Sequence, residues 1–270
     1  MSNPFASAAM AAGYASDRPP MHARILARVR DDLAGRLPFA RALDIGCGAG
    51  LSTAPLRPLA RQCVGLEPTG AMLAASCTLV PDASFVVGSA EHLPFPTASI
   101  DLVAAAGSLN FMPLADALAD IHRVLTPDGI LVVYDWATAR AFVDDPALDA
   151  WFTVFRTRYP RPSSEAIFLD PPTLAGYASS FTMTDAMTFA WPLTMTVDEY
   201  ERYMLTETNV AAAVRGGTPL DDIGAWCHET LAAVFDGRPR DVLFRGYLAY
   251  LTPVADCATR TRDAGASSGT

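Results

Sequence analysis

Short apolar runs alternate with amphipathic segments through the first half of the chain. From residue 21 to 37 apolar residues recur at helical spacing, which predicts an N-terminal amphipathic helix. Five apolar runs that end in polar residues or glycine follow, at 42–45, 63–66, 84–87, 100–105 and 130–134, with a Pro-Asp-Gly turn before the last. Because such strands alternate with helical or turn-rich segments, we predict an α/β fold whose parallel sheet is covered on both faces.

The second half of the chain has a different pattern. Helical segments are predicted over 147–158, 197–214 and 221–235, and extended runs lie near 181–191 and 241–251. Two final strands joined by a helical excursion would raise the sheet to seven strands. We predict a single domain over residues 1–255 and a disordered tail over 256–270, which lacks periodicity and is rich in Ala, Ser, Gly and Thr.

Composition excludes several functions. The net charge of -9, with no run of basic residues, argues against a nucleic-acid partner. All 20 basic residues are arginine, and without lysine neither a P-loop nor Schiff-base chemistry is available. Five cysteines without a C-x-x-C pair disfavour a disulfide framework and a metal site, so we expect a reducing cytoplasm. We also expect neither export nor a membrane span, because no signal-peptide pattern or run of eighteen apolar residues is present.

A glycine-rich loop follows the first predicted strand. The stretch LDIGCGAG places Gly46, Gly48 and Gly50 at every second position after Asp44. Glycine has no Cβ, so such a loop lets backbone N–H groups approach a ligand closely. A dinucleotide-binding loop would read G-x-G-x-x-G, but Leu51 stands at the third glycine position. The spacing therefore disfavours a pyrophosphate.

Residues after the next two strands suggest a nucleoside ligand. Glu67 ends the second strand, where its carboxylate could accept hydrogen bonds from both hydroxyls of a ribose. After the third strand, Ser89, Ala90 and Glu91 stand where a nucleobase would project. We interpret the pattern as a site for a nucleoside that carries no phosphates.

With these motifs the sequence resembles class I S-adenosylmethionine-dependent methyltransferases, in particular the small-molecule branch that includes trans-aconitate methyltransferase-like proteins. The resemblance covers roughly residues 10–136 and weakens toward 252. It implies a Rossmann-like sheet, S-adenosyl-L-methionine as cofactor, and three parts of the domain. These are a cofactor-binding core at 10–136, substrate-covering helical segments around strand six at 137–240, and a last strand at 241–252.

The resemblance also assigns roles to residues. The glycines would take the methionine part of the cofactor, and Asp44 would orient the loop and the amino group. Tyr14 and Arg18, in YASDRPP, would close over the cofactor and approach its carboxylate. The remaining expected cofactor residues are Cys47, Pro68, Met72 near the adenine, and Ala106. The sequence departs from the family in having Ser89 where an aspartate is frequent, and AAAGSLNFM after the fourth strand.

The methyl acceptor is expected near the ends of the fourth and fifth strands. Asn110 and Asp135 lie there, and Asp135 could also accept a proton. Farther on, Tyr203 and Glu207 are predicted to share a helical face with Tyr200 and to cover the acceptor. The stripe would equally suit a partly buried amphipathic face. His22 lies too close to the N-terminal helix for a role to be assigned.

We therefore predict methyl transfer from S-adenosylmethionine to a small, partly apolar metabolite by in-line displacement. Two alternatives stay open: a cyclase or pericyclase that retains the cofactor, and a non-catalytic cofactor-binding subunit. A small-molecule substrate is the expected partner, without nucleic acid or membrane. The acceptor atom and the oligomeric state, for which a homodimer is one option, are left open.

Overall fold

The computed structural model describes residues 14–161 and 166–255 and is built around one seven-stranded sheet. The strand order is β3-β2-β1-β4-β5-β7-β6. Strands β1 to β5 are parallel, whereas β7 is antiparallel to β5 and to β6. The strands are β1 (Phe39–Ile45), β2 (Ala60–Glu67), β3 (Ser84–Val87), β4 (Ile100–Ala106), β5 (Leu125–Trp136), β6 (Phe181–Met195) and β7 (Arg240–Pro253). The predicted α/β fold is confirmed.

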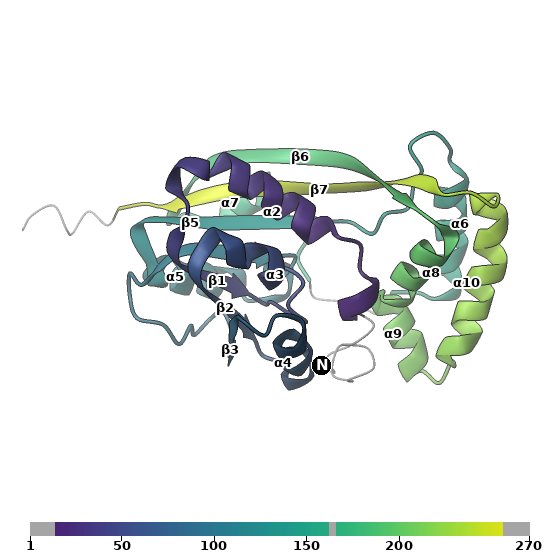
Figure 1. Cartoon of the computed structure of the whole chain (residues 1–270), viewed down its shortest axis with the longest axis horizontal. Helices are drawn as coiled ribbons and strands as arrows, with labels where there is room; N and C mark the ends of the chain where they lie inside the picture. The colour runs from purple at the N-terminus through teal and green to yellow at the C-terminus, as the bar shows by residue number, and fades with distance from the viewer. Residues whose placement is uncertain (1–13, 162–165, 256–270) are drawn as a thin grey trace, which may run out of the picture.

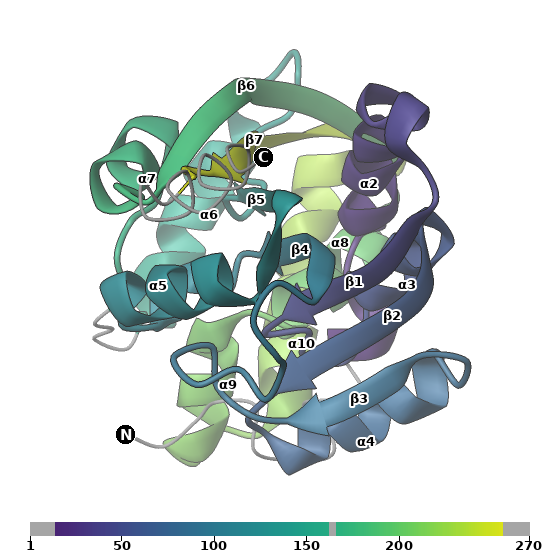
Figure 2. The ribbon, with the colours of Figure 1, turned by 90° about the vertical axis from the view of Figure 1, so that its left-hand side faces the viewer.

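Helices cover both faces of the sheet (Figures 1 and 2). On one face, alternate residues of β4 and β5 pack with α2; on the other, the intervening residues pack with α5. This alternation follows from the two-residue period of a strand and explains why the strands are apolar throughout. The first-half helices are α2 (Met21–Asp32), α3 (Thr53–Leu56), α4 (Gly70–Leu79) and α5 (Leu114–Val124).

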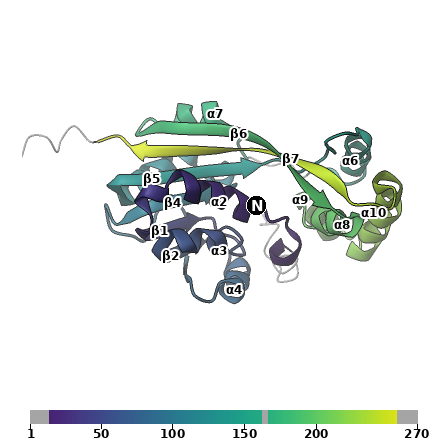
Figure 3. The same cartoon turned by 45° about the horizontal axis from the view of Figure 1, so that its top comes forward.

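All but one of the remaining helices form a group at one end of the sheet. Helices α6, α8, α9 and α10 gather beyond the ends toward which β4 and β5 run, while α7 lies over the sheet (Figure 3). Long strands β6 and β7 reach into this group and carry it. The bounds are α6 (Ala147–Arg158), α7 (Pro171–Tyr177), α8 (Val197–Leu205), α9 (Thr208–Arg215) and α10 (Leu220–Phe235).

Three predicted boundaries need correction. Helix α2 ends at Asp32 instead of continuing to 37, and a short 3₁₀ turn over Ala34–Arg36 replaces its last part before Pro38. The Pro-Asp-Gly segment at 127–129 lies within β5, where the pairing with β4 shifts register. The helix predicted over 197–214 is two helices, because the backbone of Glu207 is extended and separates α8, which ends at Leu205, from α9.

Two expectations concern the chain as a whole. Within the part of the chain that the structure describes, no helix has the length and apolar character needed to cross a bilayer. The tail predicted over 256–270 lies outside the described residues.

Candidate active site at the carboxyl edge of the sheet

The carboxyl ends of the central strands meet along one edge of the sheet. Strands β2, β1, β4 and β5 are parallel neighbours, and Asp44 of β1 stands level with Gly65 and Ala104 on either side. The helix group of the second half lies beyond this edge (Figure 3). In open parallel sheets this edge is where ligands bind. Most of the site residues predicted from the sequence lie here.

Asp44 is fully buried at this edge, and only one of its two carboxylate oxygens accepts hydrogen bonds from described residues. Its Oδ2 atom accepts hydrogen bonds from the hydroxyls of Ser52, at 2.7 Å, and Thr53, at 2.6 Å. Its Oδ1 atom is buried and has no partner among the described residues. Burial raises the pKa of Asp44 to about 6, the nearby Glu67 adds to the rise, and the two hydroxyls oppose it. A buried carboxylate oxygen without a donor is costly, so the arrangement suits a cationic ligand group.

The three loop glycines serve different purposes. A Cβ on Gly46, which has a φ of +66°, would lie 2.6 Å from the Cβ of Ser108. That glycine is therefore required by packing between two loops of the fold, in addition to any contact with a ligand. A Cβ on Gly48, at a φ of +54°, would meet nothing within 4 Å, whereas Gly50 packs against α4. Gly48 is thus the glycine of the three that faces open space.

Glu67 ties the glycine loop to the end of β2. Its Oε2 atom accepts the backbone N–H of Gly48 at 3.2 Å, and its Oε1 atom accepts that of Thr69 at 3.0 Å. The residue is buried, while the following Pro68 is exposed. Each carboxylate oxygen can accept a further hydrogen bond, so Glu67 could hold two hydroxyl donors from a fixed position.

An apolar patch adjoins the loop. Buried Met72 and Ala49 contact each other, and the half-buried ring of Tyr14 packs against them. Beyond the end of β3, the sequence Ser89, Ala90, Glu91 is exposed, buried and half-buried in turn. These are the two segments predicted to flank a nucleobase. Ala106 is half-buried at the end of β4, and Cys47 is buried, which raises the pKa of its thiol well above its ordinary value.

Arg18 and Glu207 form an ion pair above this edge. The guanidinium of Arg18 donates to Glu207 Oε1 at 3.0 Å and lies over the rings of Tyr14, at 4.6 Å, and Tyr203, at 5.3 Å. Thr138 donates to the other carboxylate oxygen, Oε2, at 2.7 Å. The Nε atom of Arg18 is buried and unpaired within the described residues. Arg18 was predicted at the cofactor and Glu207 at the acceptor, but the two side chains form an ion pair.

The tyrosines of α8 correct the predicted stripe. Because α8 ends at Leu205, Glu207 does not share its face, and Tyr200 and Tyr203 alone lie at i and i+3. Both rings are fully buried. The Tyr200 hydroxyl donates to the carbonyl of Ala139 at 2.7 Å, and Tyr203 accepts the N–H of the same residue at 3.4 Å. Tyr203 therefore supports Arg18 from the core instead of presenting a surface to an acceptor.

Asn110 and Asp135 lie together, as the strand ends predicted. The Asn110 amide donates to Asp135 Oδ2 at 2.9 Å, and the N–H of Trp136 donates to Oδ1 at 2.7 Å. Burial raises the pKa of Asp135, and the two hydrogen bonds offset only part of that rise. Gly107 makes room for the carboxylate, since a Cβ there would lie 2.8 Å from Oδ1.

Two residues that sequence reasoning missed adjoin these groups. Tyr247 of β7 pairs opposite Asp135, so the two side chains share a face of the sheet, and its buried hydroxyl has no partner in the described part of the chain. His22 of α2 meets Tyr134 of β5, with 3.0 Å between Nδ1 and the hydroxyl, and its ring packs edge-on to Trp136 at 4.7 Å. No local sequence signal marks either residue, because strand pairing and helix packing bring them to the site.

His22 and Asp44 give opposite pH dependences of stability. Burial, with Arg18 nearby, lowers the pKa of His22 to about 3. Below about pH 6.5 the unfolded state therefore binds a proton that the folded state does not, so the folded protein loses stability as the pH drops. The raised pKa of Asp44 lets the folded state take up a proton below about pH 6. Between about pH 6 and 4, each group changes the free energy of unfolding by about 1.4 kcal/mol per pH unit. The two changes have opposite signs, so they offset each other.

We therefore expect His22→Gln to remove the loss of stability that His22 causes as the pH falls. The free energy of unfolding of the variant should increase by about 1 to 2 kcal/mol from about pH 6 to 5, relative to the same change in the unaltered protein. Urea unfolding at several pH values measures the difference. Parallel pH profiles for the two proteins would show that His22 does not titrate between the folded and unfolded states.

Comparison with known proteins agrees with this geometry. Residues 43–133 match the family model described as a methyltransferase domain. An uncharacterized methyltransferase of Synechocystis sp. is 32% identical over 123 residues, which cover 44% of this chain and 58% of that protein. Demethylmenaquinone methyltransferase of Beutenbergia cavernae is 34% identical over 116 residues, covering 43% and 48%. The matches thus span about half the length of these relatives.

A solved structure described as a type II methyltransferase from Anaeromyxobacter dehalogenans extends the likeness to the fold as a whole. It superposes with a TM-score of 0.63 over 86% of this chain and 95% of that one, at 22% identity. The matched segment, 43–133, contains the glycine loop, Glu67 and the end of β4. Residues 43–133 are therefore similar to a methyltransferase domain, and the chain as a whole has the fold of a solved methyltransferase structure.

Proposed function

We propose that this protein transfers the methyl group of S-adenosylmethionine to a small, partly apolar metabolite. The observation that carries the proposal is the unpaired, buried Oδ1 atom of Asp44, near the end of the strand that leads into the loop in which Gly48 faces open space. A carboxylate in this state would gain from the amino group of the methionine part. One relative is named as a demethylmenaquinone methyltransferase, and a small-molecule substrate in that name supports the substrate class.

The residues present fit this cofactor. Glu67 would hold the ribose hydroxyls, and Met72 with Tyr14 would line the adenine, beside Ala90 and Glu91. Arg18 would approach the carboxylate, and the unpaired Nε atom is available for it. The loop needs no phosphate clamp. When bound, S-adenosylmethionine supplies an electrophilic methyl group on its sulfonium.

On the acceptor side, Asp135, Asn110 and Tyr247 provide orientation and proton removal. Burial raises the pKa of Asp135, which makes its carboxylate a better base than an exposed aspartate. Asn110 fixes one carboxylate oxygen, and the unpaired Tyr247 hydroxyl can hydrogen-bond an acceptor oxygen or nitrogen. An acceptor proton would pass to an oxygen of Asp135, and the acceptor would take the methyl group as its bond to sulfur breaks, which leaves S-adenosylhomocysteine.

We further propose that the chain acts as one domain in which the segments after residue 136 cover the substrate. Helices α8 and α9 stand beyond the strand ends, and the pair between Arg18 and Glu207 connects them to the N-terminal segment. Tyr203 and Glu207 then act by positioning Arg18. The trans-aconitate-like branch, a cytoplasmic location, the absence of a nucleic-acid partner and a dimeric state stay predictions.

Glu67→Ala should weaken S-adenosylmethionine binding by about 1.5 to 3 kcal/mol, because two hydroxyls lose a charged acceptor. Part of the loss will come from the N–H groups of Gly48 and Thr69, which lose their acceptor too. Glu67→Gln keeps one carbonyl oxygen and should lose less. Calorimetric titration measures both variants, and an unchanged affinity in each would place the ribose elsewhere.

The decisive experiment incubates the full chain with S-adenosylmethionine and a library of small metabolites. Methylated product together with S-adenosylhomocysteine would establish the transferase. Rearranged product without cofactor consumption would select the cofactor-retaining cyclase instead. Tight cofactor binding with no product from any library member would favour the non-catalytic subunit and count against the proposal.

A further inference from the structure

A cavity lined by four arginines lies beyond the end of β5. Its volume is about 210 Å³, and its walls come from the segment after β5, from α6 and from β7. The charged lining residues are Arg140, Arg156, Arg161 and Arg245, and the others are Ala137, Thr138, Phe152 and Leu243. No acidic side chain is among these lining residues. Such a concentration of positive charge is unexpected in a chain of net charge -9.

Few carboxylates neutralise this cluster. Arg140 lies 3.7 Å from Asp149, and Arg161 lies 3.9 Å from Glu207, whose charge Arg18 already shares at 3.0 Å. Within residues 14–161 and 166–255, neither Arg156 nor Arg245 has an ion pair. The four arginine side chains line one cavity at exposed positions, and a multiply charged anion between them would offset their mutual repulsion.

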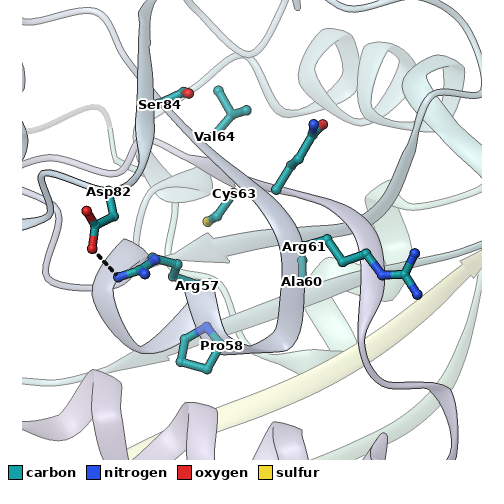
Figure 4. A pocket seen from close by; sticks show the side chains of 9 residues that line it. Arg57, Pro58, Ala60, Arg61, Cys63, Val64, Asp82 and Ser84 are labelled. Atoms are coloured by element: carbon teal, nitrogen blue, oxygen red, sulfur yellow. Dashed lines mark ion pairs between the residues drawn. The ribbon is translucent and has the colours of Figure 1, made fainter.

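A larger cavity, at the amino-terminal end of β2, differs from the arginine cavity in its charge. It has a volume of about 670 Å³ and holds two arginines (Figure 4). Arg57 there is paired with Asp82, a residue of the same cavity wall, at 3.1 Å. That cavity also lies at the amino-terminal end of β2, away from the edge that carries Asp44 and Asp135. Among the described residues it therefore holds one unpaired arginine against one ion pair, a smaller excess of positive charge, and it lies away from the site.

Strand geometry connects the arginine cavity to the acceptor residues. Along β7, Leu243, Arg245 and Tyr247 occupy alternate positions and so project from one face. Tyr247 stands opposite Asp135 on β5, and Arg245 is about 7 Å farther along the strand. From the other side, Thr138 of the cavity wall donates to Glu207 at 2.7 Å, the partner of Arg18. A small molecule could span from the cavity to Asp135.

We infer that this cavity binds a multiply charged oxyanion carried by the methyl acceptor, a phosphate ester or diphosphate being favoured over carboxylates. Planar guanidinium groups pair with phosphate oxygens in a bidentate manner, and several of them can surround one such group. The inference rests on the proposed function in assigning the anion to the acceptor. Anion binding itself does not depend on that function.

The test titrates the full chain, saturated with S-adenosylhomocysteine, with inorganic phosphate, pyrophosphate or citrate at constant ionic strength. Calorimetry and the arginine side-chain NMR signals report binding. The variant is Arg156→Gln/Arg245→Gln. The matched control is Arg28→Gln/Arg30→Gln, which removes the same charge from exposed positions on α2. Circular dichroism and the melting temperature of each variant confirm that it is folded.

Saturable pyrophosphate or phosphate binding, weakened at least tenfold in the cavity variant and less than twofold in the control, would support the inference. Tighter binding of citrate with the same variant pattern would support the oxyanion cavity but assign it to a polycarboxylate. Equal weakening in both double variants, or no saturable binding of any of the three anions, would overturn it. If the unaltered chain binds the anions but does not bind S-adenosylhomocysteine, the anion cavity is supported and the proposed function is not.

Discussion

Asp44→Asn is expected to lower the affinity for S-adenosylmethionine about 100-fold or more, equivalent to about 2.7 kcal/mol. An asparagine can keep its carbonyl oxygen toward the hydroxyls of Ser52 and Thr53, which Asp44 accepts at 2.7 and 2.6 Å. Its amide NH₂ would then replace the unpaired Oδ1 atom. A donor in place of a negative acceptor faces the cofactor's ammonium group, so the loss exceeds that of one ordinary hydrogen bond.

The same variant should not lose stability without ligand. With a folded-state pKa of about 6, the Asp44 carboxylate costs the unliganded protein on the order of 2 to 3 kcal/mol at pH 7, and a neutral amide avoids this cost. Thermal melts with and without S-adenosylhomocysteine separate the two effects. Asp101→Asn, which alters an acceptor for the backbone N–H of Arg41, is the control. A variant that unfolds without ligand, or that keeps the full ligand-induced shift, would contradict this account.

Asp135→Asn is expected to lower kcat by about 10² to 10³ for an oxygen or nitrogen acceptor, while cofactor affinity changes less than threefold. The amide has nearly the shape of the carboxylate but cannot take a proton. It would also face the Asn110 amide, which now donates to Oδ2 at 2.9 Å. The effect should therefore appear in the chemical step more than in binding.

Single-turnover kinetics across pH measures this effect. Because burial raises the pKa of Asp135, the rate of the unaltered enzyme should fall on the acidic side as that carboxylate is protonated, and the variant should lose this limb. Tyr247→Phe is the companion variant, which removes one hydroxyl and keeps the titration. Unchanged turnover in Asp135→Asn would show that positioning alone drives transfer, and a large loss of cofactor affinity would place Asp135 on the cofactor side.

The sequence by itself determined the fold class and the cofactor loop. Both rest on short-range patterns: buried parallel strands read as apolar runs, and a loop that approaches a ligand needs glycine at fixed places after a strand. Asp44, Gly48 and Glu67 lie at or directly after the ends of β1 and β2, and parallel pairing brings those ends together. Asn110 and Asp135 were predicted by the same rule beyond the end of β4 and at the end of β5, and a hydrogen bond joins their side chains.

Only the tertiary structure decided which distant residues meet. Arg18 and Glu207 are 189 positions apart, and the break after Leu205 places Glu207 outside the face of α8. His22 reaches Tyr134 across 112 positions. Helical periodicity shows that a face is buried, but it does not show what covers it. The partners of a side chain depend on how helices pack on the sheet and on the register of antiparallel β7, and both are set by contacts between segments far apart in the sequence.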